Sequence, residues 1–554
     1  MEKKGVIESA AKFASSLLNK GTPLLEAKRK ASAKFGLRGV LKNSEILRAV
    51  SGKERAKLLP MLKLRPTRTA SGVTPVAVMA NSDCPHGKCL YCPRGANAAQ
   101  SYTGKEPAAM RAIQNNYDPK AQVLSRLGQY KALGHPTSKC ELIIMGGTFL
   151  AQKPEFQEKF VKQCFDAFNG KPSKNLESAK KLNERAAHRV VGVTFETRPD
   201  WAREEHASEM LRMGGTRVEL GVQTIDDEVY KKVERGHTVR DVVNATRICR
   251  DAGLKVCYHI MPGLFATPEK DIAMFTELFS NPDFRPDMLK IYPCMVLEGT
   301  GLYKLWKKGK YAPYDTEQAA EVIEQMLLRV PRYVRVMRVQ RDIPSNLIAA
   351  GVKNSNLMQI IEERLAKQGL RCGCIRCREA GIMQLMKARE AGQEEKKRRG
   401  NETWEGKSAK SKHEEASAQE NAGISKRNVR MLRYDYFASG GTEVFLSFED
   451  VENNILLGFL RLRIPARSWR REIGGRGAIV RELHVYGGEV SVGEKGEAGA
   501  VQHSGYGEKL LAEAERIARK SGKSELIVIS GVGSREYYYR HGYEPKGPYV
   551  AKQL

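Results

Sequence analysis

Short apolar, β-branched runs alternate with amphipathic stretches through the middle of the chain. Seven such runs are predicted to be strands: Pro75–Met79, Leu142–Met145, Val190–Phe195, Val218–Gly221, Val256–Ile260, Leu289–Tyr292 and Val334–Val339. Helical periodicity lies between them, at Lys120–Leu133, Pro154–Phe168, Ala202–Met213, Val239–Asp251 and Glu317–Leu328. This alternation predicts parallel strands with right-handed crossovers, as a barrel or an open α/β sheet. Functional side chains are then expected at the carboxyl ends of the strands.

The pattern changes in the last third of the chain. Residues 387–427 are rich in charge and nearly free of apolar side chains, which predicts a flexible or solvated linker. Beyond it, four strands and one helix predict an α+β domain, at Glu443–Phe448, Leu456–Leu462, Ala478–Val485, Gly507–Ser521 (the helix) and Glu525–Ile529. We therefore divide the chain into a basic helical segment (1–69), an α/β domain (70–370), a cysteine-rich segment (371–386), the linker (387–427) and an α+β domain (428–554).

Composition and charge narrow the class of protein. The 554 residues are too many for one ordinary core, and 41% hydrophobic with 28% charged residues is typical of globular domains. No apolar run could cross a bilayer and no signal peptide is present, so we expect a cytoplasmic protein with no membrane partner. The net charge of +29 favours a polyanionic partner. Much of the basic excess lies in residues 1–69; a solvated tail is the alternative there, but the interleaved leucines favour folded, nucleic-acid-binding helices.

The first cysteine group indicates an iron–sulfur cluster. Eleven cysteines without a secretory signal argue against a disulfide framework. Cys84, Cys89 and Cys92 follow the first predicted strand, and three thiolates at this spacing suit three irons of a 4Fe–4S cluster whose fourth iron stays open. Structural zinc is the alternative, but it takes four protein ligands and no fourth cysteine is near.

A glycine turn supports the same interpretation. Gly146, Gly147 and Thr148 end the second predicted strand, where the turn exposes backbone groups that suit the amino and carboxylate groups of S-adenosylmethionine (SAM). Two glycines alone are weak evidence, because tight turns use them everywhere. One strand after the cysteine motif, they favour a radical-SAM core built as a partial (βα) TIM-type barrel.

The second cysteine group, Cys372, Cys374 and Cys377, precedes the linker. The CxCxxC spacing supplies three thiolates, and zinc in a structural role between the two domains fits best. A redox pair is the alternative. The fourth ligand is left open among Cys294, a histidine and a distant cysteine.

Longer motifs give a specific resemblance. They are Gln100–Ile113, Gly192–Asp200, Arg217–Thr224, His259–Leu264, Arg338–Pro344 and Gly351–Leu357. Together they closely resemble the catalytic subunit of Elongator, a family of enzymes that join a radical-SAM core to an acetyltransferase domain. The likeness covers nearly everything from residue 65 to 554 except the linker. Eukaryotic members have a longer gap between the first two cluster cysteines, so the gap here indicates an archaeal or bacterial type.

The resemblance implies an enzyme that modifies the wobble uridine of tRNA. SAM and acetyl-CoA would together make 5-carboxymethyluridine, with a reductant, the anticodon stem-loop of tRNA as partner, and accessory subunits or a homodimer. The SAM contacts are then expected at Gly146, Gly147, Thr148, Glu196 and Arg198. Glu196 and Arg198 could instead form a structural ion pair. Lys290 and Tyr292 end a strand and are expected to face the flipped uridine as catalytic residues.

The C-terminal domain carries the signature of an acetyltransferase of the GNAT (Gcn5-related N-acetyltransferase) fold. Gln502 opens a Q-x-x-G-x-G loop before a helix, whose free N–H groups suit the pyrophosphate of CoA. Carried over from the family, the acetyl-CoA contacts are expected at Lys139, Glu482, Leu483, His484, Val485, Tyr506, Gly507, Glu508 and Tyr538. Since Lys139 lies in the other domain, the two sites would share one cavity or one migrating substrate.

Two other functions compete with this one. A protein lysine acetyltransferase with a structural iron–sulfur domain needs a general base near the thioester, and Glu482 and Tyr538 could serve. A tRNA-binding scaffold without turnover is the other. The basic N-terminal segment and the intact cysteine motif argue against the lysine acetyltransferase.

Overall fold

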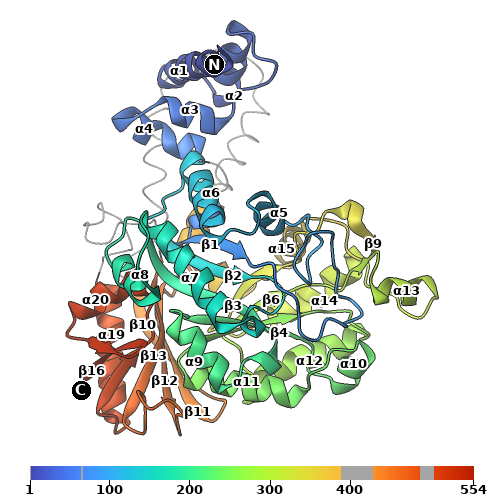
Figure 1. The fold of residues 1–554 in the computed structure, drawn as a ribbon, viewed down its shortest axis with the longest axis vertical. Coiled ribbons are helices and arrows are strands. Elements are labelled where there is room, and N and C mark those ends of the chain that lie inside the picture. Colours follow the sequence, from blue (N-terminus) through green and yellow to red (C-terminus); the bar gives the residue numbers. More distant parts are fainter. Residues whose placement is uncertain (1, 64–65, 388–427, 487–504) are drawn as a thin grey trace.

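The computed structural model describes residues 2–63, 66–387, 428–486 and 505–554. The chain forms an N-terminal group of four helices, a central α/β unit and a C-terminal sheet (Figure 1). The predicted linker, apart from residue 387, and Gln502 lie outside the described residues. No helix within the described ranges is both long and apolar enough to cross a membrane.

Seven parallel strands form the central sheet, in the order β1-β2-β3-β4-β5-β6-β8. Their bounds are Thr74–Met79 (β1), Lys139–Met145 (β2), Arg189–Thr197 (β3), Arg217–Gln223 (β4), Lys255–Ile260 (β5), Met288–Ile291 (β6) and Arg335–Val339 (β8). Each predicted run is a strand. The sheet curls with its helices on the outside (Figure 1), which confirms the predicted partial barrel.

The outer helices match the predicted ones to within two residues. They are α6 (Pro119–Ala132), α7 (Pro154–Asn169), α9 (Glu204–Arg212), α11 (Val239–Asp251) and α14 (Thr316–Leu328), joined by α12 (Pro268–Ser280). Local signals set their starts. Thr238 and Asp241 form a capping box at the start of α11, and proline occupies the first turn of α6, α7 and α12.

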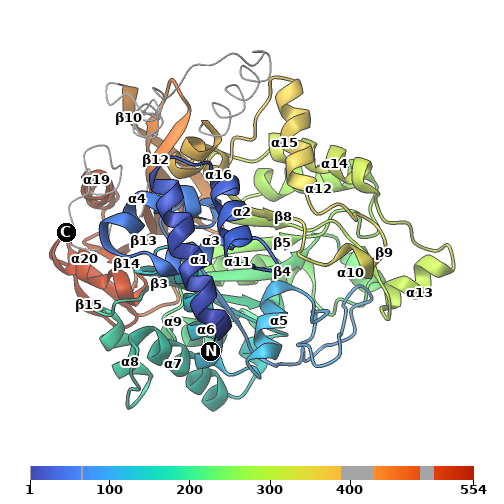
Figure 2. The ribbon, with the colours of Figure 1, turned by 90° about the horizontal axis from the view of Figure 1, so that it is seen from above.

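Smaller elements sit beyond the carboxyl ends of the strands or at the margins. They are α5 (Pro107–Gln114), α8 (Leu176–Asn183), α10 (Asp227–Lys232), β7 (Val296–Leu297), α13 (Gly301–Lys307), β9 (Ile348–Ala350), α15 (Leu357–Lys367) and α16 (Ile375–Arg378). β7 and β9 pair antiparallel as a separate two-stranded sheet. Both views place α13 at the margin farthest from the C-terminal sheet (Figures 1 and 2).

The N-terminal segment is a folded helical unit rather than a solvated tail. Its helices are α1 (Glu2–Asn19), α2 (Leu24–Lys34), α3 (Asn43–Ala49) and α4 (Gly52–Leu62). They enclose a small core of their own that includes Ala10, Ala14, Leu41, Ile46 and Leu58. The unit rests on α6 (Figures 1 and 2), where the Arg55 guanidinium donates to the Lys131 carbonyl at 3.3 Å.

The C-terminal unit is a seven-stranded mixed sheet in the order β10-β11-β12-β13-β14-β16-β15. Its elements are β10 (Val429–Ala438), β11 (Gly441–Asp450), β12 (Ile455–Pro465), β13 (Gly477–Val485), α19 (Tyr506–Lys520), β14 (Glu525–Val528), α20 (Arg535–Tyr539), β15 (Glu544–Lys546) and β16 (Tyr549–Gln553). Only β13 and β14 pair in parallel. The predicted strands and helix are present, while β10, β15 and β16 were not predicted.

A buried array of charges joins the barrel to the C-terminal sheet. It comprises four arginines and four carboxylates, from both units: Arg250, Asp251, Asp287, Glu443, Arg461, Arg463, Arg481 and Glu482. The Arg481 guanidinium of β13 donates to both carboxylate oxygens of Asp287, at 2.8 and 2.6 Å, and to Glu443 at 2.9 Å. Arg463 donates twice to one carboxylate oxygen of Asp251 in α11, at 3.0 and 2.5 Å.

The array balances four positive against four negative charges, so burial leaves no net charge. Arginine cations hold the pKa of Asp287 well below its usual range, although burial acts to raise it. Desolvating these groups is offset only while every partner is present. The interface therefore holds the two units in one relative position.

Replacing Arg481 with methionine should loosen that interface. Asp287 and Glu443 would lose a shared partner while staying buried, which costs about 3–5 kcal/mol. The expected result is a lower denaturant midpoint and separate unfolding of the two units, measured by urea titration. Arg516→Met, in an exposed pair with Glu513, is the matched control and should leave the midpoint unchanged. Equal effects of the two substitutions would contradict the assignment.

Candidate active site

The loop that carries the first cysteine group is held against the end of β2 by two glycines. Gly146 and Gly147 have φ values of 107° and 47°. A Cβ on either would lie 2.2 Å from a backbone oxygen, that of Ala80 or Ser82. The Ser82 hydroxyl also donates to the Gly146 carbonyl at 2.6 Å. Only glycine permits this approach, so the pair positions the segment that leads to Cys84.

Two of the three thiols in this group have hydrogen-bond donors already in place. The guanidinium of Arg235, a buried side chain, lies 3.4 Å from Cys89 Sγ. Cys92 Sγ receives the Gln100 amide at 3.1 Å and lies 3.0 Å from the Ser101 hydroxyl. Donors of this kind stabilise sulfur that carries negative charge, as in a metal-bound thiolate.

The third thiol, Cys84, also has hydrogen-bond donors, and its surroundings lower its pKa. Burial acts to raise its pKa, but the Thr148 hydroxyl and the backbone N–H groups of Gly87 and His86 outweigh that effect, and the pKa is lowered. The positive charge of Arg198 acts in the same direction. Two residues predicted to contact SAM, Thr148 and Arg198, are therefore close to a cysteine of the first group.

The barrel lumen holds a chain of polar side chains instead of an apolar core. Near its mouth, Tyr102 donates to Glu196 at 3.0 Å, and the Lys290 ammonium donates to the same carboxylate at 3.1 Å. Lys290 also forms an ion pair with Glu219. Glu219 also contacts His259, whose ring nitrogen lies 2.8 Å from Glu219 Oε2.

The chain continues toward the amino ends of the strands. Arg217 lies 3.3 Å from Glu219 and 2.8 Å from Glu141, which also accepts the Thr194 hydroxyl at 3.0 Å. Charged groups thus line the lumen from the cysteine loop to the amino ends of the strands, which face the C-terminal unit.

The lumen groups fix one another's charge. Burial acts to lower the pKa of Lys290, yet the carboxylates of Glu219 and Glu196 raise it well above its usual value. Burial acts to raise the pKa of Glu219, but Lys290, His259 and Arg217 hold it well below its usual value. Both groups are therefore charged at neutral pH, and Lys290 is a permanent cation at the mouth of the barrel.

The residues predicted to be functional at the ends of β3 and β6 do not all form the contacts expected from the sequence. Glu196 faces Lys290 in the lumen, whereas Arg198 turns away and binds Asp200 at 2.9 and 3.0 Å, so the considered Glu196–Arg198 ion pair is not formed. Tyr292 packs edge-on against His259 with ring centroids 5.6 Å apart. Glu196, Lys290 and Tyr292 thus share the mouth of the lumen.

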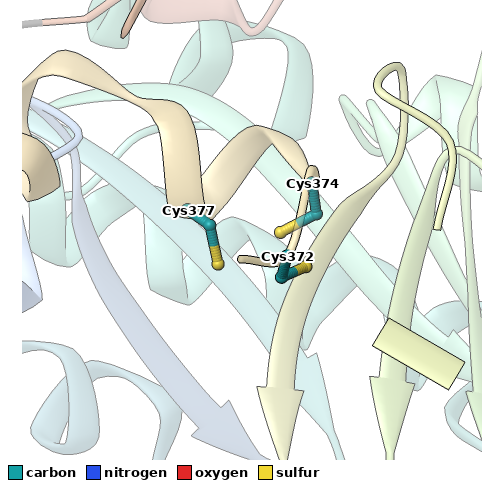
Figure 3. A group of neighbouring side chains, drawn as sticks. All are labelled: Cys372, Cys374 and Cys377. Carbon is teal, nitrogen blue, oxygen red and sulfur yellow. The ribbon is translucent and has the colours of Figure 1, made fainter. Parts of the chain in front are cut away.

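The second cysteine group is compact. The sulfurs of Cys372, Cys374 and Cys377 lie within 4.8 Å of one another, and Figure 3 shows the three side chains side by side. A tetrahedral ion with bonds of about 2.3 Å separates its sulfurs by about 3.8 Å, which suits this group. Cys84, Cys89 and Cys92 form no such compact triad, which leaves room for a larger group than one ion.

One proposed fourth ligand for the second group is wrong. Cys294 packs in a different cluster, beside Tyr311, at the carboxyl ends of the strands. Among the described residues, no histidine or further cysteine completes the compact triad. Arg335 instead ties the segment to the C-terminal unit, because it donates to Glu379 at 2.6 Å and to the Tyr486 hydroxyl at 2.9 Å.

The end of β13 borders an opening in the C-terminal sheet. β13 pairs with β14 through residues 477–480, where β14 ends at Val528, so among the described residues Glu482 and the residues after it have no paired strand on that side. Glu482 accepts the Arg461 guanidinium at 2.9 Å, and the His484 ring lies 2.9 Å from the Ser71 carbonyl. These two side chains point to the barrel interface. Leu483 and Val485 pack against the C-terminal core instead.

The remaining residues predicted to contact acetyl-CoA lie around the same opening. Tyr506, Gly507 and Glu508 form the first turn of α19, which follows Gly505 at φ 77°. A Cβ on Gly507 would lie 2.9 Å from the Tyr537 hydroxyl and 3.8 Å from the Val485 side chain. Tyr538 is buried in α20. Lys139 begins β2 and pairs in register with Arg189, whose backbone adjoins Gly533 of the C-terminal unit.

Several residues of the site were not predicted to belong to it, although Glu219 and His259 stand in motifs that carry the family resemblance. Glu219, Cys257 and His259 form the second compact group of potential ligands, beside Lys290. Charged residues within a strand that is buried on both faces could have revealed Glu219. Arg235 had no local signal, because its contact with Cys89 spans 146 residues of sequence.

Comparison with protein families gives three matches. Residues 81–279 match the Radical SAM superfamily, residues 286–367 the Radical_SAM C-terminal domain and residues 10–70 the ELP3 N-terminal domain. Together they cover the barrel and the N-terminal helices.

Individual relatives match over most of their length. A Methanocaldococcus infernus protein named tRNA uridine(34) acetyltransferase is 47% identical over 520 residues, which span 92% of this chain and 91% of that protein. Human Elongator complex protein 3 is 42% identical, over 97% of this chain and 94% of its own. The solved structure of archaeal Methanocaldococcus infernus Elp3 with an N-terminal deletion is similar with a TM-score of 0.72 and 44% identity, over 88% of this chain and 100% of that one.

Replacing Glu219 with glutamine tests the lumen chain. Its lowered pKa means that ionised Glu219 stabilises the fold fully above pH 4.5, and that this contribution is lost as the pH falls through the lower folded-state pKa. Removing one partner of this buried set should therefore cost about 3–5 kcal/mol at pH 7, and progressively less below pH 4.5, because the pKa of Glu219 is lowered in the folded state. Denaturant titrations at several pH values measure this. Glu228→Gln, in an exposed pair with Lys231, should show no such trend.

Proposed function

Because this chain belongs to the family of Elongator complex protein 3 and the tRNA uridine(34) acetyltransferases, we propose that it modifies the wobble uridine of tRNA. The observation that carries this proposal is the continuous polar lumen. A cysteine loop lies at one end of it, and an acetyltransferase-like sheet is fixed at the other end by the buried charge array. Chemistry on two substrates can then share one protein interior.

The first cysteine group suits a 4Fe–4S cluster. Cys84, Cys89 and Cys92 would ligate three irons, and Arg235 and Gln100 would donate to the thiolates. Such a cluster supplies the electron that cleaves SAM into a 5′-deoxyadenosyl radical. Gly146, Gly147 and Thr148 would present backbone and hydroxyl groups to the amino acid end of SAM.

The lumen residues would orient the uridine and its new substituent. Lys290 is a buried cation at the mouth and suits a uracil carbonyl or a developing carboxylate. Tyr292 offers a ring for stacking, and Glu196 holds Lys290 in place. Arg198, bound to Asp200, would act from the cluster side.

Acetyl-CoA would occupy the opening between β13 and β14. The first turn of α19, at Tyr506, Gly507 and Glu508, presents backbone N–H groups to the pyrophosphate. The backbone of Glu482–Val485 would pair with the pantetheine arm, and Tyr538 would border the thioester. Lys139 would reach the same substrate from β2. The 5′-deoxyadenosyl radical would take a hydrogen atom from the acetyl methyl group, and that carbon would bond to C5 of uridine. Loss of one electron, back to the oxidised cluster, and of the C5 proton would restore the ring, and hydrolysis of the thioester would release CoA and leave the carboxymethyl group.

Zinc suits the second cysteine group. The compactness of Cys372, Cys374 and Cys377 matches one tetrahedral ion, and the segment lies between the barrel and the C-terminal sheet. We assign it a structural role there. A cytoplasmic setting, an external reductant, and either accessory subunits or a second copy of the chain complete the proposal.

Labelled acetyl-CoA tests the function directly. Cluster-reconstituted protein is incubated without oxygen with SAM, a reductant, tRNA and acetyl-CoA labelled in the acetyl group, and the nucleosides are analysed by mass spectrometry. Labelled 5-carboxymethyluridine at the wobble position is expected. Cys92→Ala should abolish it, because the cluster loses an iron ligand. Cys164→Ala, which alters a buried thiol outside the site, is the matched control.

Two outcomes would overturn the proposal. Label on the lysines of an added protein and none on RNA would favour the lysine acetyltransferase, which the named relatives do not favour. Wild-type activity in Cys92→Ala would remove the cluster from the mechanism.

A further inference from the structure

The helix α13 and the residues that follow it, to Lys310, carry a dense and unneutralised set of positive charges. From residue 299 to residue 314 the chain has four lysines and no acidic residue. Lys304, Lys307, Lys308 and Lys310 are all exposed. Within the described residues none of these ammonium groups has a carboxylate within 4 Å, unlike Lys231, which pairs with Glu228 at 2.6 Å. Such a group of free cations is complementary to a polyanion.

Aromatic rings lie among these charges. Tyr303 and Trp306 are half-buried, and the Lys307 ammonium lies 5.6 and 5.2 Å from their ring centres. Nearby, Lys232 of α10 lies 4.1 Å from the ring centre of Phe265. Lysines for phosphates and ring faces for bases are the combination that binds single-stranded nucleic acid.

A cavity lies beside the residues that precede α13. Its volume is about 250 Å³, and Leu297 and Glu298, just before the helix, form part of its wall. Arg94 and Lys105 of the cysteine loop and Asn346 line it from other sides. Arg94 and Lys105 supply positive charge, while Asn346 and Glu298 supply an amide and a carboxylate that can form hydrogen bonds. The cavity lies beside the loop that holds Cys92.

α13 is also tied to the cysteine loop itself. The backbone N–H of Leu302 donates to the Leu90 carbonyl at 2.7 Å, and a Cβ on Gly301 would lie 2.6 Å from the Leu90 side chain. Leu90 lies between Cys89 and the buried ring of Tyr91. A ligand held on α13 is therefore held at a fixed place relative to the cluster cysteines.

We propose that α13 and the cavity beside its start dock the single-stranded RNA that flanks the target nucleotide. The lysines hold backbone phosphates, the exposed faces of Tyr303 and Trp306 stack on bases, and the cavity receives one neighbouring base. This inference rests on the proposed function. It assigns RNA contacts to the barrel mouth, on the far side of the barrel from the C-terminal sheet (Figures 1 and 2).

Salt-dependent binding of tRNA to the full chain tests it. The variant Lys307→Ala/Lys308→Ala/Lys310→Ala removes three phosphate contacts, so the log–log salt slope should fall by about 2 and the affinity at low salt by roughly 10- to 100-fold. Lys159→Ala/Lys171→Ala/Lys174→Ala removes the same charge from exposed sites around α7 and should leave both unchanged. Trp306→Leu should weaken binding with an unaltered salt slope, because stacking releases no counterions. Unaltered thermal midpoints and iron–sulfur absorbance confirm that each variant is folded and loaded.

The outcomes separate this inference from the function on which it rests. If tRNA binding depends steeply on salt in the wild type and equally steeply in the α13 variant, the docking surface is wrong but the RNA function stands. A wild-type slope near one charge would overturn the RNA function itself. If the α13 variant binds tRNA normally but loses polyglutamate, the surface takes an acidic peptide and the RNA assignment is wrong.

Discussion

The relative position of the two chemical centres depends on the buried charge array between the barrel and the C-terminal sheet. Asp287 is its hub, because it precedes β6 on the barrel side and accepts both terminal nitrogens of Arg481 on β13. An apolar interface of similar area could slide by small steps at little cost. An array of directional ion pairs cannot, since a shift that breaks one pair leaves a buried charge unpaired. Glu482 belongs both to this array and to the end of β13, so the proposed acetyl-CoA site would share the rigidity of the array.

The barrel was predictable because parallel strands covered on both sides are continuous apolar runs bounded by turns. Elements whose stability comes from their neighbours were not. Six consecutive residues of β10, Arg430–Asp435, are exposed, so its sequence lacks the alternation that marks a half-buried strand. β15 contains Pro545, and β7 has only two residues. Each of these is held by pairing to a partner strand, and pairing leaves no trace in a single sequence.

The residues of the candidate site also differ in whether local sequence could reveal them. Cys84, Cys89 and Cys92 share one short loop, and Gly146-Gly147 meets it through an adjacent strand, so spacing alone was enough to find them. The groups that tune them were out of reach. Arg235 comes from the segment after α10, and the partners of Lys290 lie on two other strands. Even where the residues were named, the contacts differed, since Arg198 binds its neighbour Asp200 and leaves Glu196 to the lumen.

The ionic lumen also sets how the barrel responds to heat. Most (βα) barrels fill the interior with layers of branched apolar side chains. Here Glu141, Arg217, Glu219, Lys290 and Glu196 occupy that space. The hydration of charged groups becomes less favourable as temperature rises, so burying these pairs costs less in warm surroundings, while hydrophobic stabilisation per unit area levels off. The lumen, where we place the reaction, is therefore the part of the interior whose ion pairs become more stabilising as the temperature rises.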